Sequence, residues 1–187
     1  MTSALEDIFG LSSVEPTVLA PASNASGRFL QIQVGSTGAQ TVSFLLPVAH
    51  TLGVIDHPQA QILSVPRMPA AVLGVCEWQG EMIWVVDLVP WLGMELLAQT
   101  DAPGAAPSLI LVHDREQVLA LAVQQMGEIE TLEMKRLQSP SPGLSAPVIL
   151  SMTLAYDPVT RLPVLDVPRL FQRLRSPSTS ALPQLST

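Results

Sequence analysis

The sequence has little charge, few aromatic residues and a single cysteine. Only 13% of its 187 residues are charged, against about 25% in an average globular chain, while 48% are hydrophobic. The nine Lys and Arg residues form no basic run and the formal net charge is −7, which argues against binding to nucleic acid or to an anionic membrane surface. The lone Cys76 excludes an intramolecular disulfide and fits a reducing compartment.

Long apolar runs and a secretion signal are missing too. No apolar run approaches the roughly 18 to 20 residues that a membrane-spanning helix needs. The first ten residues contain Glu6 and Asp7 but no Lys or Arg, unlike the basic start of a secretory signal. We therefore expect a cytoplasmic protein that does not insert into a membrane, folded as a single domain or as two small domains fused tightly.

Motifs for catalysis and for metal binding are also absent. His50, His57 and His113 are scattered, with no cysteine or carboxylate at the spacing of metal ligands. The chain has no G-x-S-x-G, Walker-type or H-E-x-x-H motif. A helix cap accounts for Asp87, and Cys76 reads as a small hydrophobic residue. The sequence predicts a protein that is not an enzyme and that binds no cofactor and no metal.

The clearest structural signal is a pair of apolar runs, 75–78 and 82–86, on either side of Gln79-Gly80-Glu81. This pattern predicts a β-hairpin, followed at Asp87 by a short helix. Successive strand residues point to opposite faces of a sheet, so five apolar residues in a row need cover on both faces. The outer face must be covered by a second subdomain or by a partner, or remain an exposed patch.

The three tryptophans Trp78, Trp84 and Trp91 all lie within this region. Large aromatic side chains are most often core residues, but tryptophan is also enriched where proteins bind one another. A third arrangement has all three lining a pocket, which would make the protein a small-ligand-binding β-barrel. Both functional alternatives stay open on the sequence alone.

Short strands separated by Gly and Pro are expected along most of the chain, and the 17 prolines argue against a mainly helical fold. Strands are predicted at 29–34, 42–46, 109–113, 118–123, 148–156 and 162–167, with a polar segment at 124–138 and a closing helix at 168–174 capped by Asp166. The segment VVDLVPWL (85–92) is echoed by VLDVPRLF (164–171), which suggests two copies of one β unit packed together.

The two ends differ in composition from the centre. We expect a flexible N-terminal arm over residues 1–27, whose segment ALEDIFGL (4–11) has apolar residues at helical spacing, and a disordered tail over 175–187. The folded part is expected at 28–174, with barrel subdomains at about 42–98 and 105–174 and a shared N-terminal strand.

Two segments together resemble the CheW family, the adapter of bacterial chemotaxis arrays. They are VPRMPAAVLGVCEWQGEMIWVVDL (65–88) and LILVHDREQVLALAV (109–123), the latter followed by a polar segment that reaches Leu137, Ser139 and Pro140. The resemblance covers residues 28–174 and implies a mainly β fold of two five-stranded SH3-like β-barrels packed together, with short helices.

The resemblance also implies a non-enzymatic signal-transduction adapter. Its partners would be a methyl-accepting receptor and the regulatory domain of a CheA-type histidine kinase, in a two-component system for chemotaxis, phototaxis or pilus motility. The barrel faces would meet kinase domains. The surface that faces the receptor would contain Val54, Ile55, Asp56, Val65, Pro66, Glu77, Trp78, Gln79 and Gly80. The family usually has Arg before the turn glycine, where this chain has Gln79, so a charge pair near that surface would be weakened or absent.

Overall fold

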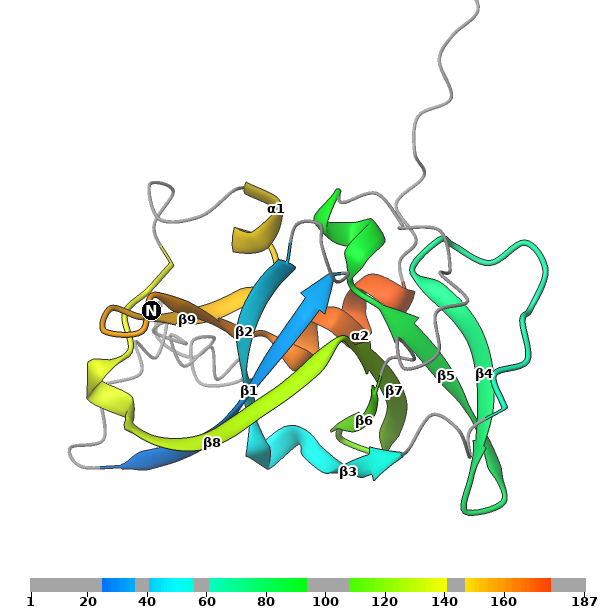
Figure 1. Cartoon of the computed structure of the whole chain (residues 1–187), viewed down its shortest axis with the longest axis horizontal. Helices are drawn as coiled ribbons and strands as arrows, with labels where there is room; N and C mark the ends of the chain where they lie inside the picture. Colours follow the sequence, from blue (N-terminus) through cyan, green and yellow to red (C-terminus); the bar gives the residue numbers. More distant parts are fainter. Residues whose placement is uncertain (1–24, 36–40, 56–60, 94–107, 141–146, 176–187) are drawn as a thin grey trace, which may run out of the picture.

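The computed structural model describes residues 25–35, 41–55, 61–93, 108–140 and 147–175, and they form two β-sheets (Figure 1). Residues 1–24 of the predicted N-terminal arm, including its ALEDIFGL segment, and nearly all of the predicted tail lie outside the described residues. Ser26 and Gly27, which were expected in the flexible arm, instead begin strand β1 and pair with Glu133 and Leu132.

Each sheet has five strands, which confirms the predicted class of two small β-barrel units. The first sheet contains, in spatial order, β8 (Gln125–Glu133), β1 (Ser26–Gly35), β2 (Thr41–Pro47), β10 (Leu162–Leu165) and β9 (Thr153–Asp157). The second contains β3 (Thr51–Ile55), β6 (Ser108–Asp114), β7 (Gln117–Val123), β5 (Glu81–Asp87) and β4 (Val72–Trp78). Figure 1 shows the first sheet on the left, the second on the right, and helix α2 (Val167–Arg175) between them.

The two sheets have the same topology because the chain contains two repeats that exchange strands. Each repeat begins with a hairpin, β1–β2 or β6–β7, and its next three strands join the opposite sheet. In both sheets the last strand of one repeat lies parallel to the second strand of the other, β10 beside β2 and β5 beside β7. This arrangement accounts for the echo between 85–92 and 164–171.

The exchange differs from the sequence-based division into subdomains. Each of the expected ranges, 42–98 and 105–174, supplies strands to both sheets, and β1 pairs only with β2 and β8 among the described strands. Each range contributes to both sheets because the chain crosses from one sheet to the other after β2 and again after β7. Hydrophobic periodicity along the chain carries no information about that crossover.

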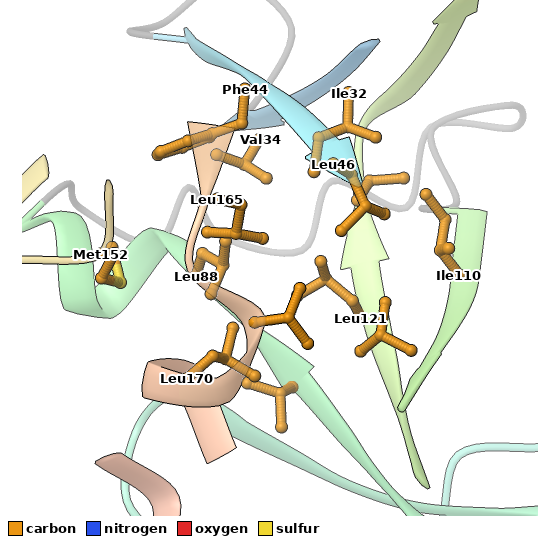
Figure 2. Close-up of a cluster of buried hydrophobic side chains, with 14 of the residues drawn as sticks. Ile32, Val34, Phe44, Leu46, Leu88, Ile110, Leu121, Met152, Leu165 and Leu170 are labelled. Carbon is orange, nitrogen blue, oxygen red and sulfur yellow. The ribbon is translucent and has the colours of Figure 1, made fainter. Parts of the chain in front are cut away.

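The hydrophobic core has three parts. The largest lies between the sheets and takes side chains from both of them and from α2, as Figure 2 shows for Ile32, Phe44, Leu121, Leu165 and Leu170. A smaller cluster lies on the other face of each sheet. We refer to the three as the shared core, the first-sheet core and the second-sheet core. A strand buried on both faces lies between the shared core and one of the smaller cores, as β7 does throughout residues 119–123.

Two predicted segments differ in the structure. The expected strand at 148–156 is divided into the short helix α1 (Pro147–Leu150) and β9. Hydrogen bonds from Met152 N (3.0 Å) and Thr153 Oγ1 (2.7 Å) to the Ile149 carbonyl close this helical turn. The polar segment 124–138 contains the nine-residue strand β8, which shows no alternation of apolar residues because it is an edge strand with most side chains in solvent.

Candidate protein-interaction surface

The β4–β5 hairpin forms as the sequence predicts. Its two turn residues, Gln79 and Gly80, have φ values of 51° and 84°. Positive φ at both central positions is the signature of a type I′ turn, whose twist matches that of the two strands. After the hairpin, Asp87 Oδ1 accepts a hydrogen bond of 2.9 Å from the Val89 amide, so this carboxylate satisfies a donor at the start of the 3-10 turn η2 (Val89–Leu92).

A short extended segment joins the edge of this hairpin. Leu63 and Val75 exchange two backbone hydrogen bonds of 2.8 and 2.9 Å. The approach is so close that a Cβ on Gly74 would lie 2.2 Å from the Leu63 carbonyl oxygen, and Gly74 has a φ of 152°. Only glycine fits this position, because it has no Cβ and readily adopts positive φ.

The two faces of β5 have different environments. Ile83 and Val85 point into the second-sheet core. On the outer face Val86 is buried in the shared core, but Met82 is 54% exposed and Trp84 is 42% exposed. The shared core therefore covers only one end of the outer face, and the rest remains an exposed patch.

The outer-face side chains of this region form a continuous row across the sheet, in which Val75 is half-buried. Trp84 pairs with Val75, which pairs in turn with Leu63, so all three side chains lie on the outer face. Leu63 is 56% exposed. We call Leu63, Val75, Met82 and Trp84 the β4–β5 patch. Single exposed apolar residues are ordinary, whereas a large contiguous apolar patch is typical of surfaces that bind another protein.

The structure places the predicted receptor-facing residues in three locations. Glu77, Gln79 and Gly80 are exposed at the tip of the hairpin, whereas Trp78 is partly buried against the second-sheet core. Val65 and Pro66 lie at the other end of β4, before the turn in which Val72 N donates to the Pro69 carbonyl at 2.8 Å.

The third location is the end of β3. There Val54 is 48% exposed and Ile55 packs against the second-sheet core, the same cluster that Trp78 contacts. Asp56 lies outside the described residues. The end of β3 and the hairpin therefore both pack against the second-sheet core. Val65 and Pro66, in contrast, are separated from the hairpin tip by the length of β4.

The tryptophans do not line a common pocket. Trp78 contacts the second-sheet core, Trp84 lies on the outer face of β5, and Trp91 packs against the shared core. A hollow of about 210 Å³ among the described residues contains no tryptophan; it is lined by Gln31, Gln33, Gln125, Gly127 and Glu128. The prediction that the three tryptophans line one pocket, on which the ligand-binding alternative depends, is therefore wrong.

A buried ion pair lies in the first sheet, far from any predicted site residue in sequence. Arg136 Nε and Nη2 each donate to the Asp157 carboxylate at 2.6 Å, and the Asp157 side chain is fully buried. Burial alone would raise the pKa of Asp157, but hydrogen bonds from Arg136, Thr160 and Val159 outweigh it and hold this pKa well below its ordinary range. Every oxygen lone pair is directed at a structural partner, so the pair stabilises the fold and offers no general base.

Two titratable groups of the second sheet, Asp87 and Cys76, also have structural surroundings. Burial raises the pKa of the Asp87 carboxyl, with the Val89 N–H acting in the opposite direction. Burial likewise raises the pKa of the Cys76 thiol, which keeps it protonated and unreactive. Among the described residues, no group of three or more His, Cys, Asp and Glu side chains is placed to hold a metal ion. No helix in the described ranges is both long and apolar enough to cross a bilayer.

Sequence reasoning missed two features of this surface. The burial of Val86 beside the exposed Met82 and Trp84 could not be predicted, because it depends on how far the first sheet and α2 extend over the outer face of β5. The shared contact of Arg169 and Arg173 with Ser151 was also missed, although their spacing of four residues on a predicted helix places them on one side of it.

Comparison with known proteins agrees with this fold. The family model of the CheW-like domain matches residues 28–175. The solved structure of the scaffolding protein TtCheW from Thermoanaerobacter tengcongensis superposes with a TM-score of 0.60 at 14% sequence identity, covering 75% of this chain and 88% of that chain. At this identity the likeness concerns the fold alone. No curated protein matches the chain.

Proposed function

This chain belongs to the CheW-like domain family, and we propose that it is a cytoplasmic, non-enzymatic adapter. In this role it couples a methyl-accepting receptor to the regulatory domain of a CheA-type histidine kinase, in a system for chemotaxis, phototaxis or pilus motility. The solved structure that this chain resembles is that of a scaffolding protein, and the chain's own surface supports a binding role.

The observation that carries the proposal is the exposure of the β4–β5 patch. Trp84 lies on the same face of β5 as Val86, so the exposed surface continues directly from the shared core. A partner domain that packs on Met82 and Trp84 would extend that core across an interface. Aromatic and methionine side chains are enriched at the centres of such interfaces, where a few of them supply most of the binding free energy.

We assign the two partners to different surfaces. The kinase regulatory domain would bind the β4–β5 patch, because a large apolar face suits a stable domain-to-domain contact. The receptor would bind the end of β3 at 54–56 and the hairpin tip at 77–80, with Val65 and Pro66 as a further contact. Gln79 itself brings no charge to this surface, so this side chain would contribute only neutral hydrogen bonds to receptor binding.

The test is a titration of the purified chain with the kinase regulatory domain from the same source. Trp84→Gln should weaken binding about tenfold or more, because it removes a central aromatic contact. Met82→Gln should have a smaller effect in the same direction. Thermal unfolding of each variant, followed by circular dichroism, shows whether the fold is intact.

Leu154→Gln is the matched control. Leu154 is 55% exposed on β9, the edge strand of the other sheet. The substitution changes the same kind of exposed apolar side chain and should leave kinase binding unchanged. Equal binding by the wild type and by a folded Trp84→Gln variant would contradict the assignment of the kinase to the β4–β5 patch.

Receptor binding has its own test at the hairpin tip. Gln79→Glu should reduce capture of the receptor in a pull-down and leave kinase binding intact, because Gln79 is exposed and does not contribute to the β4–β5 patch. If the variant captured as much receptor as the wild type, the receptor would have to bind elsewhere.

A further inference from the structure

Strand β8 is the longest free edge among the strands that the structure describes. Two of the other edge strands carry a short added segment, since Leu63 exchanges backbone hydrogen bonds with β4 and Gln138 does so with β9. Strand β3 has five residues, whereas β8 has nine and pairs with β1 alone among the described strands. The outer side of β8 therefore presents backbone N–H and C=O groups to which another strand can add (Figure 1).

The side chains of β8 are acidic. Glu128, Glu130 and Glu133 lie on this strand, which contains no Lys or Arg. Glu133 forms an ion pair with Lys135, whereas no ion pair of Glu128 or Glu130 is present within the described ranges. Like charges on facing strands repel, so β8 of a second copy is a poor partner for this edge. The edge is complementary instead to a segment that carries Lys or Arg.

A polar hollow lies beside the same edge. Its volume is about 210 Å³, and it is lined by Gln31, Gln33, Gln125, Gly127 and Glu128. Within the part of the chain that the structure describes, the four polar side chains of this lining form no hydrogen bond or ion pair with the protein. The wall on the β8 side is low at Gly127, which has no side chain. Since a water molecule occupies about 30 Å³ in the liquid, the hollow has room for one long side chain.

The position equivalent to Gln31 in the other repeat is apolar. Gln31 pairs with Leu45 beside β10, and Leu111 pairs with Ala120 beside the equivalent strand β5. Leu111 is buried in the second-sheet core, whereas Gln31 lines the hollow. The fold therefore does not require a polar residue at this position, and the hollow is a property of the first sheet alone.

We infer that β8 binds an extended segment of another protein that carries Lys or Arg, with one of these basic side chains in the hollow. The backbone of the segment pairs with the free edge of β8. Ile129, which is 50% exposed, adds an apolar contact on the other face of the strand. The Glu128 carboxylate and the amide oxygens of the glutamines accept the hydrogen bonds that an ammonium or guanidinium group donates.

This chain contains no basic segment of its own that could take the place of the partner. All nine of its Lys and Arg residues lie in the described ranges. The segments 1–24 and 94–107 carry Glu and Asp without Lys or Arg, so the acidic edge would repel them. The net charge of −7 also favours the approach of a basic partner. The inference does not rest on the adapter role, because β8 belongs to neither of the surfaces assigned to the receptor and the kinase.

The experiment measures fluorescence anisotropy of a labelled peptide of alternating Lys and Val, titrated with the full chain at low salt. A peptide of alternating Thr and Val is the neutral probe with the same tendency to form a strand. A third peptide has the Lys-Val sequence with a methyl group on every backbone nitrogen, which removes the N–H donors. We expect the Lys-Val peptide to bind about tenfold or more tightly than either of the others, and added salt to weaken it.

Variants of the chain locate the contact. Glu128→Gln/Glu130→Gln should weaken binding of the Lys-Val peptide about tenfold or more, and Gln125→Leu should weaken it less. The control Glu81→Gln/Glu116→Gln removes the same charge from two exposed glutamates of the second sheet and should bind like the wild type. Thermal unfolding followed by circular dichroism shows whether each variant is folded.

Three outcomes would overturn the inference. Equal weakening by the two double variants would reduce the effect to net charge. Equal binding of the neutral peptide would remove the role of the glutamates, and equal binding of the methylated peptide would exclude pairing with the strand edge. Because the readout contains neither a receptor nor a kinase, its failure is distinguishable from failure of the proposed adapter role.

Discussion

The two repeats share one topology, but side chains at equivalent positions are exposed in one repeat and buried in the other. In the second sheet Leu63, Val75 and Trp84 form a row in which Leu63 and Trp84 are exposed. In the first sheet the corresponding row is Gln138, Tyr156 and Pro163, and there Tyr156 and Pro163 are buried. Backbone pairing is the same in both rows, so the fold does not require an exposed tryptophan. The exposed row is a property of one repeat, as expected if it serves binding.

The inner positions beside these rows differ as well. Cys76, next to Val75, is a small apolar residue in the second-sheet core. The position next to Tyr156 is Asp157, which binds Arg136. One barrel is closed by apolar contacts and the other by a buried ion pair, although both have the same strand order. Substitutions at equivalent positions should therefore have unequal effects.

The largest effect is expected at Asp157. Asp157→Ala leaves Arg136 and Thr160 without their buried acceptor; because the Arg136 side chain is 32% exposed and water can reach it, we expect a cost of about 3 kcal/mol of unfolding free energy, the low end for a broken buried ion pair. Cys76→Ala, at the equivalent position, removes one small side chain and should cost about 1 kcal/mol. Urea denaturation of both variants measures the difference. Similar losses in the two variants would show that the ion pair adds nothing to the first sheet.

The same carboxylate should make the fold sensitive to acid. The pKa of Asp157 in the folded state lies below the unfolded value of about 3.9. Ionised Asp157 therefore stabilises the fold fully above that value, and its contribution is lost as the pH falls below about 4 towards the folded-state pKa. Urea denaturation between about pH 6 and pH 3 should show a steeper loss of stability in the wild type than in Asp157→Asn. Parallel pH profiles would contradict this account.

An intermediate effect is expected at Gly74. The equivalent position in the first sheet is Ala155, since Gly74 pairs with Val85 as Ala155 pairs with Val164. Gly74→Ala must strain the backbone and displace the Leu63 carbonyl, at a cost of about 1–3 kcal/mol. Ala155→Gly should cost only about 0.5–1 kcal/mol, through backbone entropy. Thermal unfolding distinguishes the two, and equal shifts would mean that the contact with Leu63 is easily rearranged.

The smallest effects are expected at the two helix caps. Asp166→Ala removes the acceptor for the Arg169 amide, 3.0 Å away, and should cost about 1 kcal/mol. Asp87→Ala should cost less, because η2 has four residues against nine in α2 and because the substitution also removes a carboxylate whose burial is unfavourable. Chemical denaturation of the two variants tests this order. A larger loss for Asp87→Ala would show that η2 matters more than α2 for holding the shared core.

Much of the fold could be predicted from local signals. The Gln79-Gly80 turn, the Asp166 cap and the echo between 85–92 and 164–171 each reflect short-range chemistry that the sequence states directly. The α1 turn could not be predicted from the apolar run 148–156, because the Thr153 side chain decides it by bonding back to Ile149. The exchange of strands depends on contacts between residues far apart in the chain, which no local pattern reports.

The candidate surface was only partly predictable. Five apolar residues at 82–86 indicated correctly that one face of β5 needs cover or a partner, and the structure adds that Val86 is covered while Met82 and Trp84 are not. The receptor-facing residues came from a family resemblance, and their spatial relation depends on tertiary structure. For the same reason the pairing of Arg136 with Asp157 has no signature in the sequence.

The exchange of strands has a consequence for synthesis of the protein. The β1–β2 hairpin is the first pair of strands to be made, but its neighbours β8 and β10, together with β9 beside β10, are the last strands to leave the ribosome. During translation its apolar face, with Ile32 and Phe44, has no partner from its own sheet except the hairpin itself. Nascent chains halted near the end of the first repeat should therefore be bound by chaperones, and neither repeat would be released as a folded half.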